Sequence, residues 1–142
     1  MTDLTHVQQM WASDEASRRL GIVLQDVGVN DEGLGFARTC MTITEPMVNG
    51  HGITHGDFVF TLADSTFALT CNASGQLTVA AGADIDFVSA TRLGDVLVAE
   101  GRERARYGRS GITDVTVTRE PDLSMVAEFR GRSRALPPRK DA

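Results

Sequence analysis

The chain has 142 residues, 42% of them hydrophobic and 23% charged, which fits one folded domain over residues 1–142 rather than a disordered chain. Its formal net charge of −5 argues against nucleic acid as the main partner, because nucleic-acid binding needs an electropositive surface. Two cysteines are too few for a disulfide scaffold. The chain starts with polar residues that do not form a secretory signal, and it has no apolar run of the ~20 residues that a membrane-spanning helix needs. We therefore expect a cytoplasmic protein with no membrane partner.

The N-terminal part of the chain predicts a helix and then a β-hairpin. Residues 1–20 are expected to form a short amphipathic helix that ends at Gly21, because their apolar side chains recur with helical spacing. These apolar residues are Leu4, Val7, Trp11 and Ala16. Segments 22–29 and 33–43 flank a turn-forming Asn-Asp-Glu-Gly sequence, and this pattern predicts a hairpin.

A second, longer helix is predicted over residues 56–72. It follows a loop with Pro and Gly at residues 45–52, and Ser74-Gly75 stops it. The segment has no interior Gly or Pro and is too long for a typical strand, so we expect roughly four to five helical turns. Its apolar residues lie on nearly all sides of such a helix, which predicts burial on most sides.

The remainder of the chain alternates with period two, which predicts strands. The expected strands lie near residues 77–88, 95–106, 110–119 and 123–134, with turns at 91–94, 107–110 and 120–122. Because short turns join consecutive strands, we expect an antiparallel meander, and we expect the tail at 136–142 to fray. One buried helix on one curved antiparallel sheet is an α+β domain, whose second sheet face needs a cover or a partner subunit.

Asp64 lies at the middle of the long predicted helix and is the only charged residue between Phe58 and Cys71. Burying a carboxylate costs several kcal/mol unless it is paired, hydrogen-bonded or protonated. One interpretation is a structural Asp that binds a neighbouring backbone group or hydroxyl, with Ser65 and Thr66 adjacent. The other is a catalytic base or nucleophile whose pKa is set by a partly apolar cleft.

Gly56 opens this helix, where backbone N–H groups lack intrahelical partners and a ligand can approach the backbone closely. Such an amide can hold a carbonyl oxygen and stabilise the charge that develops when the carbonyl is attacked, although a glycine here also permits a tight turn. Gly56 and Asp64 are eight residues apart, about 12 Å along one helix axis, so chemistry that uses both needs two chains. Two antiparallel helices about a twofold axis would give a homodimer with two composite sites.

Two histidines lie in the loop before this helix. His51 and His55 have the spacing of zinc ligands only on a helix, which the glycines at positions 50, 52 and 56 disfavour. We therefore expect no metal site. His55, beside the helix start, is interpreted as a residue that orients the loop or contacts a substrate carbonyl.

Arginine is far more frequent than lysine, and it recurs with period two on two predicted strands, which would place each group on one strand face. These residues are Arg102, Arg104 and Arg106, and Arg130, Arg132 and Arg134. They form either a solvated outer face or a phosphate site, for which the planar guanidinium is suited. The best single candidate for a phosphate contact is the turn with Arg109, Ser110 and Gly111.

Several motifs together resemble the PaaI-type hotdog-fold acyl-CoA thioesterases of phenylacetate catabolism. The matching segments, within roughly residues 5–135, are Asn49-Gly50-His51, His55-Gly56, Leu62-Ala63-Asp64-Ser65-Thr66-Phe67, Cys71-Asn72-Ala73-Ser74-Gly75, Asp84-Ile85-Asp86-Phe87, Gly94-Asp95 and Phe129-Arg130-Gly131. The resemblance implies a hotdog fold, in which an antiparallel sheet wraps a long helix. It also implies homodimers with one continuous sheet, often paired into homotetramers, and hydrolysis of acyl-CoA, with phenylacetyl-CoA or hydroxyphenylacetyl-CoA as leading substrates.

The same resemblance implies roles for the candidate residues. Asp64 would be the catalytic carboxylate, and the Gly56 amide would polarise the thioester carbonyl, which agrees with the two-chain geometry. Asn49 and His55 would position the carbonyl or a water, and the Arg109-Ser110-Gly111 turn would meet the CoA moiety. No metal or redox cofactor is implied, since CoA is part of the substrate.

The sequence departs from the family pattern at two places. Asp57 follows Gly56 where relatives often have a second Gly, and residues 78–83 lack the Ser that assists the catalytic water in some relatives. Two alternatives to a thioesterase stay open. One is a hydroxyacyl thioester dehydratase or hydratase that uses His55 and Asp64, and the other is a non-catalytic acyl-CoA binding module.

Overall fold

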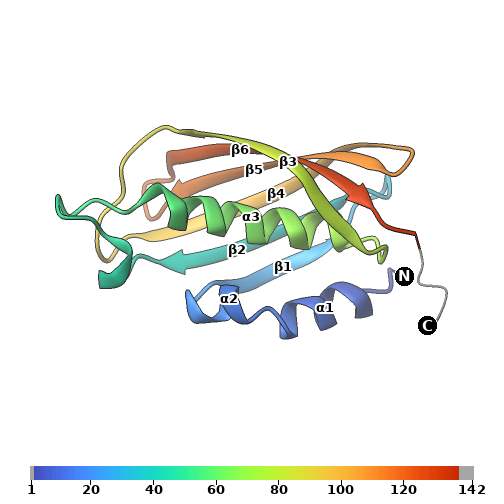
Figure 1. The fold of residues 1–142 in the computed structure, drawn as a ribbon, viewed down its shortest axis with the longest axis horizontal. Coiled ribbons are helices and arrows are strands. Elements are labelled where there is room, and N and C mark those ends of the chain that lie inside the picture. The colour runs from blue at the N-terminus through green and yellow to red at the C-terminus, as the bar shows by residue number, and fades with distance from the viewer. Residues whose placement is uncertain (1, 138–142) are drawn as a thin grey trace.

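The computed structural model describes residues 2–137, in which a curved six-stranded sheet wraps one long helix (Figure 1). The elements in chain order are α1 (Thr5–Ala12), α2 (Glu15–Arg19), β1 (Val23–Val29), β2 (Gly35–Thr42), the short 3-10 helix η1 (Glu45–Met47), α3 (Gly56–Asn72), β3 (Thr78–Phe87), β4 (Val96–Tyr107), β5 (Ser110–Arg119) and β6 (Ser124–Ala135). The expected α+β architecture of a hotdog fold is confirmed. The expected fraying at 138–142 lies outside the described residues, and no helix within 2–137 is long and apolar enough to cross a membrane.

Neighbouring strands of the sheet are antiparallel and follow the order β1-β2-β4-β5-β6-β3. The hairpin predicted over residues 22–43 is confirmed as β1 and β2. The turns predicted at 107–110 and 120–122 are also confirmed, because they join β4 to β5 and β5 to β6. In this part of the chain short turns lead directly to antiparallel neighbours, as the local pattern indicates.

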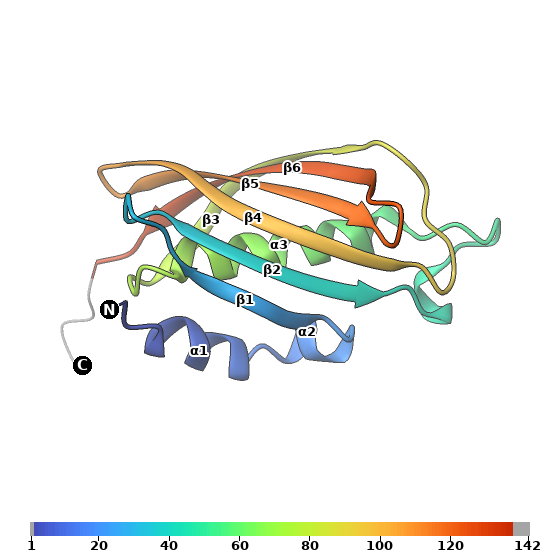
Figure 2. The same cartoon turned by 180° about the vertical axis from the view of Figure 1, so that it is seen from behind.

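The predicted meander is wrong for β3, which pairs with β6 at the far edge of the sheet and not with β4. The turn expected at 91–94 belongs to a segment that crosses past the start of α3 (Figure 2). The Thr54 backbone N–H donates to Thr91 O at 2.9 Å, and Ile53 forms an isolated β-bridge with Arg92. Because these contacts tie the segment to the loop before α3, it cannot close a hairpin between β3 and β4.

The single N-terminal helix expected over residues 1–20 is also wrong, because the chain breaks at Ser13 and Asp14 into α1 and α2. Asp14 is the N-cap of α2, and its Oδ1 accepts the Ser17 backbone N–H at 3.0 Å. A side-chain oxygen that satisfies a free backbone N–H favours the start of a new helix. Gly21, with φ of 75°, follows α2 in the left-handed conformation that ends helices.

The core lies between α3 and the concave face of the sheet. Leu62 and Phe67 of α3 are at most 1% exposed, and the rings of Phe60 and Phe67 pack on Phe129 of β6 with centroid distances of 5.4 and 5.6 Å. A methyl group at Gly131 would lie 2.7 Å from ring carbons of Phe67, so the glycine permits this close approach. The predicted burial of the helix on most sides is confirmed.

The opposite face of the sheet is polar, and its arginines bind carboxylates. The Arg130 guanidinium donates to both carboxylate oxygens of Asp114, at 2.7 and 2.9 Å, and Arg132 donates to Asp84 at 2.9 Å. The alternating burial of residues 129–134 places the arginines of β6 on the outside. The interpretation of a solvated outer face is therefore confirmed for this strand.

The expected row of three arginines on β4 is interrupted. A β-bulge between Glu103 and Ala105 shifts the register of this strand, and a bulge changes which face the following side chains reach. As a result Arg106 turns to Glu103, with Nη2 2.6 Å from Oε1, instead of continuing the exposed face of Arg102 and Arg104.

Candidate active site

The loop before α3 is built around Asn49. Its Oδ1 accepts the backbone N–H groups of His51 at 2.9 Å and Ile53 at 3.1 Å, and its own backbone N–H donates to Ile53 O at 2.8 Å. An Asn side chain that satisfies nearby backbone groups stabilises a tight turn. Within residues 2–137 these bonds leave the Nδ2 amide free to donate. The role of Asn49 in positioning a carbonyl or water stays a prediction.

His55 and Gly56 form the start of α3. The His55 backbone is extended, with its N–H donating to Met47 O at 2.8 Å and its carbonyl accepting from Phe58 N at 3.1 Å, and its ring is exposed. No acceptor for the Gly56 N–H exists among the described residues, as expected at a helix start. An exposed imidazole and a free amide thus lie at the positive end of the helix. The loop itself is not helical. His51 and His55 therefore do not lie one turn apart on a helix, which is the arrangement that their spacing would need to bind zinc.

A groove of about 430 Å³ opens beside Gly56. It is lined by Ile53, Thr54, Gly56, Val59 and residues 87–91. No lining residue is charged, so the groove suits an apolar group. The Phe87 ring lies over Gly56, since a methyl group on Gly56 would be 2.9 Å from Phe87 Cζ. Any side chain at position 56 would therefore have to displace this ring.

Asp64 lies half-buried in the middle of α3. Its carboxylate makes no hydrogen bond within residues 2–137. The hydroxyls that the structural interpretation would need are engaged elsewhere: Ser65 Oγ is 2.7 Å from Ser17 Oγ, and Thr66 Oγ1 donates to Leu62 O at 2.8 Å. The structural interpretation of Asp64 therefore lacks the contacts that would support it.

The surroundings of Asp64 raise the pKa of its carboxyl above the ordinary value. Burial contributes most, because it disfavours the charged form, and the negative charge of Asp14 contributes next. A carboxylate with a raised pKa is a stronger base, and a free one can accept a proton from water. The electrostatics of the site thus suit the catalytic interpretation.

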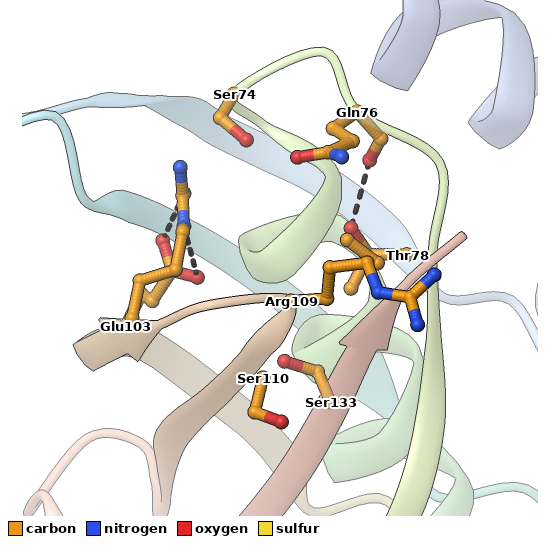
Figure 3. Close-up of a pocket in the computed structure, with 9 residues that line it drawn as sticks. Ser74, Gln76, Thr78, Glu103, Arg109, Ser110 and Ser133 are labelled. Carbon is orange, nitrogen blue, oxygen red and sulfur yellow. Dashed lines mark hydrogen bonds and ion pairs between the residues drawn. The ribbon is translucent and has the colours of Figure 1, made fainter. Parts of the chain in front are cut away.

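Arg109 and Ser110, where β4 turns into β5, lie near the other end of α3, and with Ser74 and Gln76 they line a small cavity of about 10 Å³, room for one water. Gly111 is buried on β5 and does not line this cavity. Figure 3 shows the Arg109 side chain extending past Thr78 and away from Glu103, and it is exposed. An exposed guanidinium beside hydroxyl groups can bind a phosphate, and this role of the turn stays a prediction.

Sequence reasoning missed a buried carboxylate beneath this turn. The Glu103 side chain is 2% exposed, its Oε1 lies 2.6 Å from Arg106 Nη2, and the same oxygen accepts the Gly35 backbone N–H at 3.0 Å. An acidic residue within a run of arginines was the available signal. Its burial continues the alternation of Ala99 and Gly101 on the inner face of β4, whereas its contacts with Arg106 and the Gly35 N–H could not be foreseen from the strand period.

One chain therefore does not bring the predicted site residues together. The Gly56 amide and the groove lie at the start of α3, and Asp64 lies about 12 Å further along the axis. The 109–111 turn lies near the end of the helix. The separation predicted from residue spacing is confirmed by the unbroken helix from 56 to 72. The composite site itself stays a prediction.

Comparison with known proteins places the chain in a family. Residues 51–126 match the family model described as "Thioesterase superfamily". The acyl-coenzyme A thioesterase PaaI from Escherichia coli strain K12 is 37% identical over 127 residues, which cover 89% of this chain and 86% of that protein. A putative esterase from Deinococcus radiodurans is 36% identical over 102 residues, or 71% of this chain and 68% of that protein.

Solved structures agree with this match over the whole fold. The E. coli PaaI protein from the phenylacetic acid degradation operon superposes with a TM-score of 0.86 and 32% identity, over 95% of this chain and 97% of that one. A mutant of the phenylacetic acid degradation protein PaaI from Thermus thermophilus gives a TM-score of 0.78 and 27% identity, over 87% and 100%. The chain belongs to the thioesterase superfamily and is a thioester hydrolase with the hotdog fold.

Proposed function

We propose that the protein hydrolyses acyl-CoA thioesters at a site shared by two copies of the chain. One observation carries the proposal: the half-buried Asp64 carboxylate has no hydrogen bond within residues 2–137 and lies on the same helix as the free Gly56 amide, about 12 Å away. Thioester hydrolysis needs a donor on the carbonyl oxygen and a base or nucleophile at the carbonyl carbon. A second α3, antiparallel about a twofold axis, would supply the missing member of each pair.

The edge strand β3 is the surface that we propose for this homodimer. Its outer backbone groups are unpaired within residues 2–137, and such an edge can pair with an equivalent strand. Val79 and Phe87 on β3, and Val88 after it, are 42%, 56% and 56% exposed, so pairing of two copies would bury apolar surface. A continuous sheet would result, and we propose that two such dimers form a homotetramer.

In the proposed reaction the Gly56 N–H of one protomer donates to the thioester carbonyl oxygen. Asp64 of the other protomer removes a proton from water as the water attacks the carbonyl carbon, or attacks that carbon itself to give a mixed anhydride that water then cleaves. The C–S bond breaks, and the products are the free acid and CoA. Asn49 and His55 position the carbonyl or water, and no metal or redox cofactor takes part.

The groove and the relatives support the substrate class that we propose. The E. coli relative is named an acyl-coenzyme A thioesterase. Its solved structure is described as that of a protein from the phenylacetic acid degradation operon. The groove beside Gly56 has no charged lining, which suits an aryl group. We therefore place phenylacetyl-CoA and hydroxyphenylacetyl-CoA first, in phenylacetate catabolism in the cytoplasm. We place the CoA phosphates at residues 109–111, of which Arg109 is exposed.

A thiol-release assay across a panel of acyl-CoA compounds tests this proposal. We expect the fastest release with phenylacetyl-CoA or hydroxyphenylacetyl-CoA. Asp64→Asn should keep the fold and the oligomer but lower turnover by about 100-fold or more, which is the usual contribution of a general base. Asp57→Asn, an exposed carboxylate on the same helix, is the matched control and should keep its turnover.

Three outcomes would contradict the proposal. Undiminished turnover in Asp64→Asn would reject the role of that carboxylate. Hydration of crotonyl-CoA without thiol release would indicate a hydratase instead. Tight binding of acyl-CoA with no thiol release from any compound would indicate a binding module.

A further inference from the structure

Asp14, in the break between α1 and α2, is linked by hydrogen bonds through Ser17 to Ser65, the residue next to Asp64 on α3. Both carboxylate oxygens of Asp14 are held by Ser17: Oδ1 accepts the backbone N–H at 3.0 Å, and Oδ2 accepts the hydroxyl at 2.6 Å. The carboxylate is therefore fixed in position. It is near enough to Asp64 for its negative charge to act on that group.

Two buried hydroxyls continue this link from α2 to α3. Ser17 Oγ and Ser65 Oγ are 2.7 Å apart, and the two residues are 2% and 8% exposed. A hydroxyl has one proton to donate, and Ser17 gives its proton to Asp14, so Ser65 is the donor in the contact with Ser17. The chain of bonds therefore runs in one direction, from Ser65 through Ser17 to Asp14, and it begins on the residue next to Asp64.

We propose that Asp14 is a positioning residue for Asp64: the serine chain holds its negative charge beside α3 and thereby makes Asp64 a stronger base or nucleophile. This inference rests on the proposed function, because that function assigns proton removal or attack to Asp64. Asp14 itself contacts neither the substrate nor the reacting atoms in this scheme. It acts through the charge that it presents to Asp64.

The other charged or titratable groups on the elements around Asp64 do not act in this way. They include His6 of α1, Glu15, Arg18 and Arg19 of α2, Asp57 and Cys71 of α3, and Glu103 and Arg106 of β4, whose Glu100, Arg102 and Arg104 are exposed. On the other strands Asp114 of β5 binds Arg130 and Asp84 of β3 binds Arg132. Glu15 binds Arg18 and Arg19, and Glu103 binds Arg106. Among residues 2–137, burial and the charge of Asp14 are what raise the pKa of Asp64. Removing the Asp14 charge should therefore move the titration of Asp64 towards lower pH.

Asp14→Asn is the sharpest test, because Asn is as good an N-cap as Asp. The change removes the charge, and at Oδ2 it also replaces the acceptor of the Ser17 hydroxyl with an amide NH₂ donor, so Ser65→Ala is needed beside it to report the effect of the hydroxyl chain alone. Glu15→Gln is the matched control, since it removes one negative charge from the adjacent residue of the same short helix. In the full-length protein the titration of the Asp64 carboxyl is followed by ¹³C NMR and assigned with Asp64→Asn. The pH profile of kcat/KM for phenylacetyl-CoA is measured beside it.

We expect Asp14→Asn to move both the Asp64 titration and the acid limb of kcat/KM to lower pH, and to lower the plateau kcat a few-fold with KM little changed. Glu15→Gln should leave all of these at wild-type values. Ser65→Ala, which cuts the hydroxyl chain but keeps the Asp14 charge, should give a smaller shift in the same direction. If Asp14→Asn does not fold, Asp14→Ser, another N-cap residue, replaces it.

An Asp64 titration in Asp14→Asn that matches wild type, or that matches Glu15→Gln, would overturn the inference. This result is distinct from failure of the proposed function. That failure would appear as undiminished turnover in Asp64→Asn, whatever the titration of Asp64 does in the other variants.

Discussion

Asp64 is held in the folded chain at an energetic cost. It is half-buried near a second carboxylate, it has no hydrogen bond within residues 2–137 to offset the loss of water, and its pKa is raised first by burial and then by Asp14. The folded chain therefore binds this proton more tightly than the unfolded chain does. The linked stability is present at low pH and is lost as pH rises through the folded pKa of Asp64.

This cost predicts that Asp64→Asn is more stable than the wild type at about pH 8, where the wild-type carboxyl is charged. The difference in free energy of unfolding between the variant and the wild type should shrink as the pH falls to about 4. There the wild-type carboxyl takes up a proton and is uncharged, as Asn is at every pH. Thermal or urea unfolding at a series of pH values measures it. Asp57→Asn, at an exposed position, should show no such gain. A gain that did not depend on pH would contradict the assignment of the cost to the carboxylate charge.

At the scale of elements, α3 and β6 depend on each other at one close contact. Gly131 of β6 leaves room for the Phe67 ring, which is 1% exposed. A buried ring that is packed on Phe129 cannot move away as an exposed side chain can. The close packing of the helix on the sheet therefore depends on the absence of a side chain at position 131.

Gly131→Ala is expected to lower the free energy of unfolding by about 1–3 kcal/mol, the usual cost of overpacking a core. Gly50→Ala is the control, because a methyl group at that loop position has no atom within 4 Å. Urea unfolding of both variants measures the difference. Equal stability of the two variants would show that the contact between α3 and β6 is looser than the structure indicates.

At the scale of the whole molecule, the sheet has two edges, β1 and β3. Each carries an exposed valine: Val23 on β1 is 55% exposed and Val79 on β3 is 42% exposed. Only β3 leads into the groove, through Phe87 and the segment that follows it. The same substitution can therefore be made on each edge strand. If β3 forms part of the shared site, the substitution on β3 should affect the site and the one on β1 should not.

Val79→Lys is therefore expected to prevent dimer formation, because a charge on an edge strand disfavours pairing with another strand, and to abolish thiol release. Val23→Lys makes the same chemical change at the other edge and should keep both the oligomer and the activity. Light scattering gives the mass, and the thiol assay gives the activity. An active Val79→Lys monomer would contradict a site shared by two copies of the chain.

Mixed dimers give a second test at this scale. Asp64→Asn and Gly56→Pro should each be inactive alone. Proline is tolerated at the first position of a helix and lacks the N–H. The Phe87 ring must move aside to make room for it. After co-expression, random pairing should restore about a quarter of wild-type activity, because half of the dimers would then contain one intact composite site. No recovery in mixed dimers of confirmed composition would contradict a site shared between chains.

Local patterns were sufficient for much of the fold. The helix at 56–72 and the hairpins of β1–β2, β4–β5 and β5–β6 follow from periodicity and turn residues, since each depends on neighbours in the chain. The same holds for Asp64 and Gly56, whose isolation in an apolar helix and position at its start are visible in the sequence. Their separation of about 12 Å needs only the rise of a helix.

Contacts between distant segments decided the rest. Three contacts join residues that no local period connects: the pairing of β3 with β6, the hydrogen bond between Thr54 and Thr91, and the hydrogen bond from the Gly35 N–H to Glu103. The contact of Ser17 with Ser65, which links Asp14 to the neighbour of Asp64, likewise joins residues far apart in the chain. The period of a helix or strand indicates on which face of the element a side chain lies. Which residue of another element that side chain contacts is decided by how the elements pack together.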